Sequence, residues 1–185
     1  MRVLILGAAG DLGSAIAAGL LARGHTLRLG WHRTPLPAAL ARHPSAEACR
    51  VDLSREANLP PAVAGVEAVV HAAGRLFAPA PQRFLHETNV AWLERAARAA
   101  VAARATRFVL LSFPHIEEGT TPGRPATGRQ DVAPIALHAR TRLEAERRLL
   151  AACEGTATTP VILRLGLVYG RDMKLVRAAR RLLRW

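Results

Sequence analysis

Short apolar runs alternate with alanine-rich or amphipathic segments along the chain. The runs are bounded by Gly, Pro or Asp and are typical of buried parallel strands, while the longer segments are typical of helices. The predicted strands are residues 2–7, 26–31, 49–53, 67–72, 107–112 and 160–165. The predicted helices are residues 11–23, 81–104 and 133–153, with a short helical or turn segment near Pro60 and a last helix after Gly170. This alternation predicts an α/β fold in which helices flank a doubly wound parallel sheet as three layers, α/β/α.

Two connections lack this regular pattern. Prolines interrupt residues 35–43, and residues 113–132 are rich in Pro, Gly and Thr. A connection as long as the second is unusual in a compact domain. We expect residues 113–132 to contribute to a site, to form a lid, or simply to be mobile.

The clearest chemical signal is the glycine spacing directly after the first predicted strand. Gly7, Gly10 and Gly13 form G-x-x-G-x-x-G. Gly7 permits a tight turn, Gly10 leaves room for a pyrophosphate at the backbone, and Gly13 lets the next helix pack closely on the strand. Asp11 and Leu12 begin that helix, whose N-terminal N–H groups favour a bound phosphate. A ligand-free glycine turn and a signal peptide are the alternatives, but Asp11 interrupts the apolar run. The context predicts a dinucleotide-binding domain of the Rossmann type.

Length and composition narrow the class of protein. The 185 residues indicate one domain with a substantial core. No apolar run approaches the length of a membrane span. The two cysteines form no CxxC pair, which favours a reduced, cytoplasmic setting and indicates neither a disulfide framework nor a metal site.

The net charge of +12 is carried by basic residues that are spread along the chain. Aromatic residues make up only 4%, so little is available to stack on single strands, and no nucleic-acid partner is expected. The densest basic patch, residues 171–185, predicts a basic C-terminal helix after a domain formed by residues 1–170. A solvated helix face is the favoured interpretation of the patch, with a membrane surface or polyanion as the alternative ligand.

Several segments together resemble, in order, the motifs of the extended short-chain dehydrogenase/reductase superfamily, which includes the NAD-dependent epimerases and dehydratases. Besides the glycine loop, the segments are Val51-Asp52-Leu53, residues 69–74, Thr88-Asn89-Val90, residues 107–112 and residues 163–170. The resemblance covers nearly the whole chain and implies an NAD(P)-binding fold. The further cofactor residues that it implies are Asp52 and Leu53 beside the adenine, Ala72, Ala73 and Gly74 along the cofactor, and Asn89 on the following helix.

Simpler interpretations of these positions remain open. Asp52 is equally well explained as a cap for the segment after Leu53. His71 lies on an apolar strand, where a packed core histidine is commoner than a catalytic one. Asn89 falls inside a helix and would then hold backbone groups, and Ser112 would simply end a strand.

The family's acid–base pair, Tyr-x-x-x-Lys, is replaced in this chain. The corresponding positions carry His138 and Arg142, which share one helix face at i and i+4. His138 titrates near neutrality and can give or take a proton. Arg142 can supply charge and donors to a ribose, but its pKa is too high for a proton relay. The family's usual Ser or Thr position falls near Pro114, where Ser112 or His115 could substitute, and we expect Ser112 to act as the polar partner.

The choice of cofactor depends on the end of the second strand. NAD-binding sites place a carboxylate there to hold both ribose hydroxyls. The sequence has no Asp or Glu between Asp11 and Glu47, and the strand is followed by His32 and Arg33. Arg33, together with His32, is well placed for a 2′-phosphate, with an ordinary surface arginine as the alternative. NADP(H) is therefore favoured over NAD(H).

These observations support two hypotheses of function. In the first, the protein transfers a hydride at a hydroxyl or carbonyl of a small metabolite, with His138 as acid/base. In the second, it is a non-catalytic NAD(P)H-binding sensor or assembly subunit. Family members continue past the Tyr169-Gly170 motif into a smaller substrate domain, whereas this chain ends at Trp185. We therefore expect a naturally short member, a fragment, or a partner for a second copy or another subunit.

Overall fold

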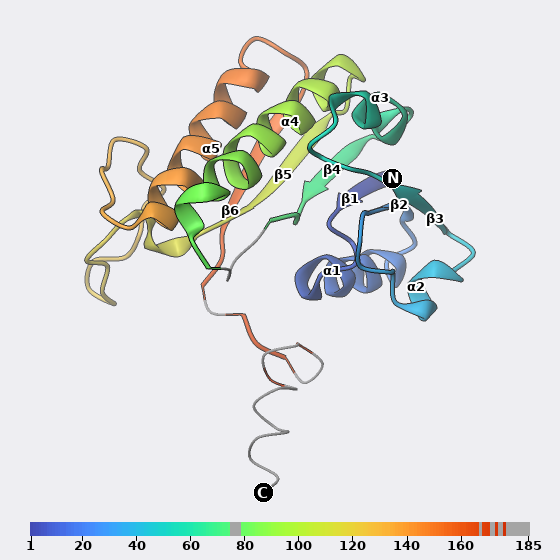
Figure 1. The fold of residues 1–185 in the computed structure, drawn as a ribbon, viewed down its shortest axis with the longest axis horizontal. Helices are drawn as coiled ribbons and strands as arrows, with labels where there is room; N and C mark the ends of the chain where they lie inside the picture. The colour runs from blue at the N-terminus through green and yellow to red at the C-terminus, as the bar shows by residue number, and fades with distance from the viewer. Residues whose placement is uncertain (75–78, 167, 171–172, 174–175, 177–185) are drawn as a thin grey trace, which may run out of the picture.

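The computed structural model describes residues 1–74, 79–166, 168–170, 173 and 176, and its centre is a six-stranded parallel sheet (Figure 1). The strands are β1 (Arg2–Leu6), β2 (Thr26–Trp31), β3 (Ala46–Arg50), β4 (Ala68–His71), β5 (Arg107–Ser112) and β6 (Thr159–Arg164). Their order is β3-β2-β1-β4-β5-β6. Strands are added outward on one side of β1 up to β3, and from β4 onward they are added on the other side. Doubly wound folds bind ligands at this change of strand order, at the carboxyl edge of the sheet.

Helices connect the strands and cover both faces of the sheet (Figure 1). The α-helices are α1 (Asp11–Leu21), α2 (Ala38–Ala41), α3 (Leu59–Val63), α4 (Trp92–Ala102) and α5 (Leu137–Cys153). Short 3-10 turns lie at η1 (Glu56–Asn58), η2 (Pro81–Arg83) and η4 (Pro114–Ile116), and a π-helical turn lies at η3 (Glu87–Ala91). The arrangement confirms the predicted three-layer α/β/α fold.

Alternate residues of the central strands build two separate cores. Leu4, Val69 and Phe108 point to the face that α3, α4 and α5 cover. Ile5 and Leu29 point to the other face, which α1 and α2 cover. A strand buried on both faces has a nearly continuous run of apolar residues, which explains why β1 and β5 could be predicted from the sequence.

Several predicted boundaries are corrected by the structure. The strand predicted at 49–53 is β3 at Ala46–Arg50, so Asp52 and Leu53 follow it in a turn. The single helix predicted at 81–104 is divided into η2, η3 and α4. The helix predicted from residue 133 begins at Leu137, and the region predicted to be irregular at 35–43 contains α2. Most of the predicted helix after Gly170 lies outside the described residues.

Candidate dinucleotide and catalytic site

The glycine loop owes its shape to close backbone contacts. Gly7 has φ +87°, and a Cβ there would lie 2.8 Å from the backbone of Ala73 at the end of β4. A Cβ on Gly13 would lie 2.2 Å from the carbonyl oxygen of Gly7. Because no side chain fits at either position, the loop can press against both the first turn of α1 and the end of β4.

Gly10 differs from the other two glycines because it is exposed. It is the N-cap of α1, and a Cβ there would meet only the Gly7 carbonyl, at 3.3 Å. Asp11 and Leu12 follow in the first turn and are partly buried. The positive end of an eleven-residue helix therefore faces accessible space beside backbone without side chains. This geometry fits a pyrophosphate group.

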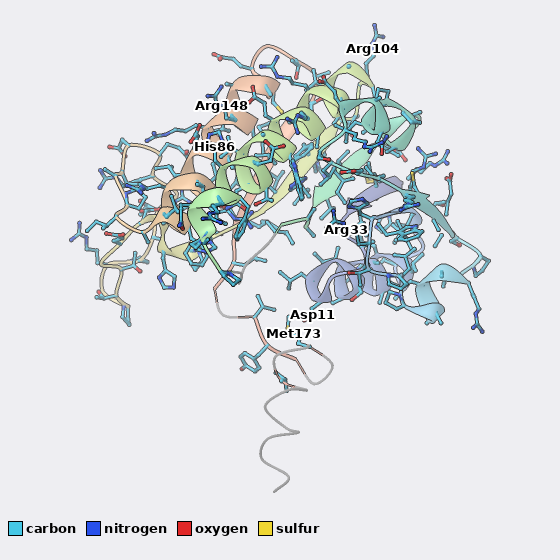
Figure 2. The ribbon with its side chains drawn as sticks, in the orientation of Figure 1. Asp11, Arg33, His86, Arg104, Arg148 and Met173 are labelled. Carbon is cyan, nitrogen blue, oxygen red and sulfur yellow. The ribbon has the colours of Figure 1, made fainter. Side chains whose placement is uncertain are left out.

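The side chains expected near the adenine lie on the β2–β3 side of the sheet. His32 Nε2 lies 3.5 Å from a carboxylate oxygen of Asp52, and Arg33 next to it is exposed (Figure 2). Asp52 accepts hydrogen bonds from the backbone N–H and the hydroxyl of Ser54, which lower the pKa of Asp52. The carboxylate thus closes a local turn with Ser54 and does not cap η1, whose N-cap is Arg55 without a side-chain cap bond, while Leu53 is buried in the core.

The ends of β4 and β5 carry the second part of the site. Ala72 and Ala73 are partly buried, and Gly74 is exposed. The guanidinium of Arg142 reaches this edge from α5: its Nη1 donates to the Leu111 carbonyl at 3.3 Å, and its Nη2 would lie 3.0 Å from a Cβ on Gly74. The structure therefore brings Arg142 to the predicted cofactor-lining segment.

Asn89 connects this edge to the start of α5. It is buried in the π-helical turn, and its amide donates to the hydroxyl of Thr141 at 3.0 Å. That hydroxyl lies 3.1 Å from the carbonyl oxygens of Leu137 and His138. The amide oxygen of Asn89 is buried without a hydrogen-bond partner among the described residues. Asn89 thus reaches the backbone around His138 only through the hydroxyl of Thr141.

His138 lies in the first turn of α5 and is partly buried. Burial, together with the positive charge of Arg142 one turn later, lowers the pKa of His138 below its ordinary 6.5. The imidazole is therefore neutral at physiological pH and can accept a proton, or donate one at a lower pH.

Ser112 ends β5, but its hydroxyl does not point to open space. It donates at 2.5 Å to Glu146, which is completely buried. Glu146 also accepts from Gln130 at 2.7 Å and from Arg164 at 2.7 Å, and Arg164 reaches Glu117 at 2.6 Å. The predicted polar partner is thus held in an ion-pair network that joins α5, β6 and the long connection.

The long connection is ordered by Glu117. Its carboxylate accepts the backbone N–H groups of Thr127, Gly128 and Arg129 at 2.7–3.1 Å. These donors, with the nearby charge of Arg164, lower the pKa of Glu117. The residues between Glu117 and Arg129 therefore form a closed loop beside the start of α5.

Sequence reasoning did not find this network. The available signal was Glu146, a carboxylate on the helix face that also carries Leu149 and Cys153. A charge in an apolar stripe predicts a buried ion pair. The partner, Arg164, could not be selected among the many arginines without the fold.

The described residues contain no cluster of His, Cys, Asp and Glu suited to a metal ion. None of the helices in the described part of the chain is long and apolar enough to cross a membrane.

The fold and the glycine-loop site match a known family. The model described as "NAD dependent epimerase/dehydratase family" matches residues 3–184, and the chain belongs to this family. Its place in the short-chain dehydrogenase/reductase superfamily, inferred above from motifs, is confirmed by solved structures. A superfamily protein from Agrobacterium tumefaciens with bound NAD superposes with a TM-score of 0.79 at 26% identity, over 97% of this chain and 55% of that one.

Two further relatives have named activities or ligands. The chain is 32% identical over 182 residues to a 2-alkyl-3-oxoalkanoate reductase of Stenotrophomonas maltophilia, covering 95% of this chain and 54% of the relative. The structure of MoeE5 with UDP-glucose and NAD gives a TM-score of 0.78 at 29% identity, over 100% and 62% of the two chains. The chain thus spans about half the length of the curated relatives it matches. Both of these solved structures contain NAD.

Proposed function

We propose that the protein is an NAD(P)-dependent oxidoreductase that transfers a hydride at a hydroxyl or carbonyl of a small metabolite. The observation that carries the proposal is the placement of Arg142 and His138. They lie one turn apart on α5, and Arg142 reaches the ends of β4 and β5 on the same sheet edge as the glycine loop. A dinucleotide-binding loop and a titratable group thus share one edge of the fold.

Some of the site residues would bind the cofactor, and His138 would transfer the proton. The glycine loop and the start of α1 would hold the pyrophosphate, and Gly74, Asn89 and Arg142 would border the nicotinamide half. The bound cofactor supplies or accepts the hydride. In carbonyl reduction, protonated His138 would donate its proton to the carbonyl oxygen. In oxidation, neutral His138 would accept the hydroxyl proton.

The pH dependence of the two directions tests the role of His138. Reduction needs protonated His138, so its rate should fall as the pH rises through the lowered pKa of this group. Oxidation needs the neutral form and should rise with pH over the same window. His138→Ala should lower kcat by about 10²-fold or more in both directions. The measurement is NADPH absorbance with a panel of carbonyl compounds at several pH values. An unchanged kcat in His138→Ala would rule out this assignment.

A non-catalytic dinucleotide sensor or assembly subunit is the second candidate function. The observation in its favour is that Ser112 is bound to Glu146, while the position of the family's Ser or Thr falls near Pro114. This candidate predicts that NADPH binds to the chain but is not oxidised with any carbonyl in the panel. Titration of NADPH fluorescence separates binding from turnover.

We further propose that NADP(H) is preferred over NAD(H). Arg33 is exposed after β2, and the carboxylate of the neighbouring Asp52 faces His32 and Ser54. A free guanidinium there would pair with a 2′-phosphate. Arg33→Ala should weaken NADPH binding about tenfold and leave NADH binding nearly unchanged, as measured by calorimetry. Equal losses for both cofactors would contradict this preference.

A further inference from the structure

Arg142 is a partly buried cation whose charge is not matched by a carboxylate. Arg28 is buried and Arg164 is partly buried, and each of them has an acidic partner: Arg28 pairs with Glu47 at 3.2 Å, and Arg164 with Glu146 at 2.7 Å. Arg142 has no carboxylate within ion-pair distance in the described part of the chain. Burial is unfavourable for a guanidinium and lowers the pKa of Arg142, and the charge of Glu146, which lies beyond ion-pair distance, opposes this only in part.

The nearest acid on the same helix does not satisfy this charge. Glu146 lies one turn after Arg142, but its oxygens already accept from Ser112, Gln130 and Arg164. The other titratable groups facing Arg142 are His71 and His138, and the charge of Arg142 lowers the pKa of both. The surroundings of the guanidinium are therefore either neutral or already paired.

The guanidinium also retains unused donors. Its one hydrogen bond to a described residue runs from Nη1 to the Leu111 carbonyl, at 3.3 Å. Nη2 lies over Gly74, where the absence of a side chain leaves room for it, and Gly74 itself is exposed. A guanidinium presents its donors as a planar fork, which matches the two oxygens of a carboxylate.

We propose that Arg142 is the binding site for the carboxylate of an oxo-acid or hydroxy-acid substrate, beside His138. The inference rests on the proposed oxidoreductase function and names the substrate class of that site. Residues at i and i+4 have Cβ atoms about 5–6 Å apart, so a short acid can place its carboxylate at Arg142 and its carbonyl at His138. The unpaired charge then gains the partner that the chain does not provide.

The test is a calorimetric titration of the chain, with and without saturating NADPH, using malonate and its neutral diamide as probes. Malonate should bind and the diamide should not. Arg142→Gln should weaken malonate binding about tenfold or more, and Arg142→Lys should give an intermediate loss because the charge remains while the fork is lost. Arg140→Gln is the matched control, since it removes an exposed positive charge from the same helix and should leave binding unchanged.

Several outcomes would overturn the proposal. They are equal binding of malonate to the wild type and Arg142→Gln, equal binding of the diamide, or inorganic phosphate binding as tightly as malonate. Loss of NADPH rather than malonate in Arg142→Gln would assign the guanidinium to the ribose instead. Thermal unfolding verifies that each variant is folded. If Arg142→Gln does not fold, the binding of malonate and of the diamide to the wild type tests the proposal. Failure of the proposed oxidoreductase function can be distinguished from failure of this inference, because it would show as an absence of NADPH binding or turnover.

Discussion

Gly13 has the least room of all the glycines in the chain. Its missing side chain lets α1 begin directly against the carbonyl of Gly7, whose own backbone touches Ala73. These contacts are between backbone atoms, which cannot relieve a clash by changing rotamer as a flexible side chain can. A single atom added at Gly13 must therefore move the loop that presents Gly10 to a phosphate.

Gly13→Ala tests this tightness. The added Cβ would lie 2.2 Å from the Gly7 oxygen, so we expect a loss of about 1–3 kcal/mol in the free energy of unfolding and a weakened affinity for NADPH. Urea unfolding and NADPH titration measure the two effects. Gly19→Ala, in the same helix, is the control, because its Cβ would meet only the end of the Arg23 side chain, at 3.7 Å. It should be neutral or add up to about 1 kcal/mol. Similar behaviour of the two variants would contradict the steric argument.

Elements whose burial follows from the local sequence were predictable, and the others were not. β5 was predicted with its observed bounds, Arg107–Ser112, because its residues form one apolar run. β3 was misplaced because it is an edge strand with mostly exposed side chains, while the apolar Val51 and Leu53 pack just after it. The π-helical turn at Glu87–Ala91 leaves no mark in the helical periodicity, so a single helix was expected there.

The candidate site shows the same division. The glycine loop and the His138–Arg142 spacing are local patterns, and the sequence predicts them directly. The bond between Ser112 and Glu146 joins residues 34 positions apart, and only the fold brings them together. Tertiary pairing therefore changed the interpretation of Ser112, from a free hydroxyl to one engaged in a network.

Arg164→Met tests the network that joins α5, β6 and the long connection. The substitution leaves the buried Glu146 without its cation, at an expected cost of about 2–3 kcal/mol, because part of the network is open to solvent. Residues 117–132 should also become sensitive to limited proteolysis. The control is Arg148→Met, on the exposed surface of α5 (Figure 2), where the ion pairs with Glu94 and Glu144 are worth less than about 1 kcal/mol. Equal losses of stability in the two variants would contradict a special role for Arg164.

The end of β4 joins the two halves of the molecule. Ala73 contacts the glycine loop through Gly7, and its neighbour Gly74 contacts Arg142. The first contact belongs to the half formed by β1–β3, and the second to the half formed by β5, β6 and α5 (Figure 1). The part of the site that would hold phosphate is thus connected to the reactive part by two successive residues. We therefore expect a displacement of one half to change the position of the site residues in the other half.

His71 lies just before this joint, and its burial links the stability of the whole fold to pH. The side chain is 1% exposed and stacks on Phe108, and burial, with the charge of Arg142, lowers the pKa of His71 to about 3. Between about pH 6.5 and pH 3 the unfolded chain therefore binds a proton that the folded chain does not. The contribution to stability is complete above about pH 6.5 and is lost as the pH falls, by at most about 1.4 kcal/mol per pH unit.

His71→Leu removes this titration. Relative to the wild type, the variant should gain in free energy of unfolding as the pH falls from 7 to 4.5, by up to about 3 kcal/mol. Urea unfolding at several pH values measures the difference, and carboxylates such as Glu117, which titrate in both proteins, cancel in it. His86→Leu is the control, because it replaces a histidine that is exposed on the surface (Figure 2), and its difference from the wild type should change far less with pH than that of His71→Leu. A constant difference between His71→Leu and the wild type across this range would mean that His71 is protonated equally in the folded and unfolded chain. The position next to Arg142 argues against that result, since a second positive charge there has no carboxylate to balance it among the described residues.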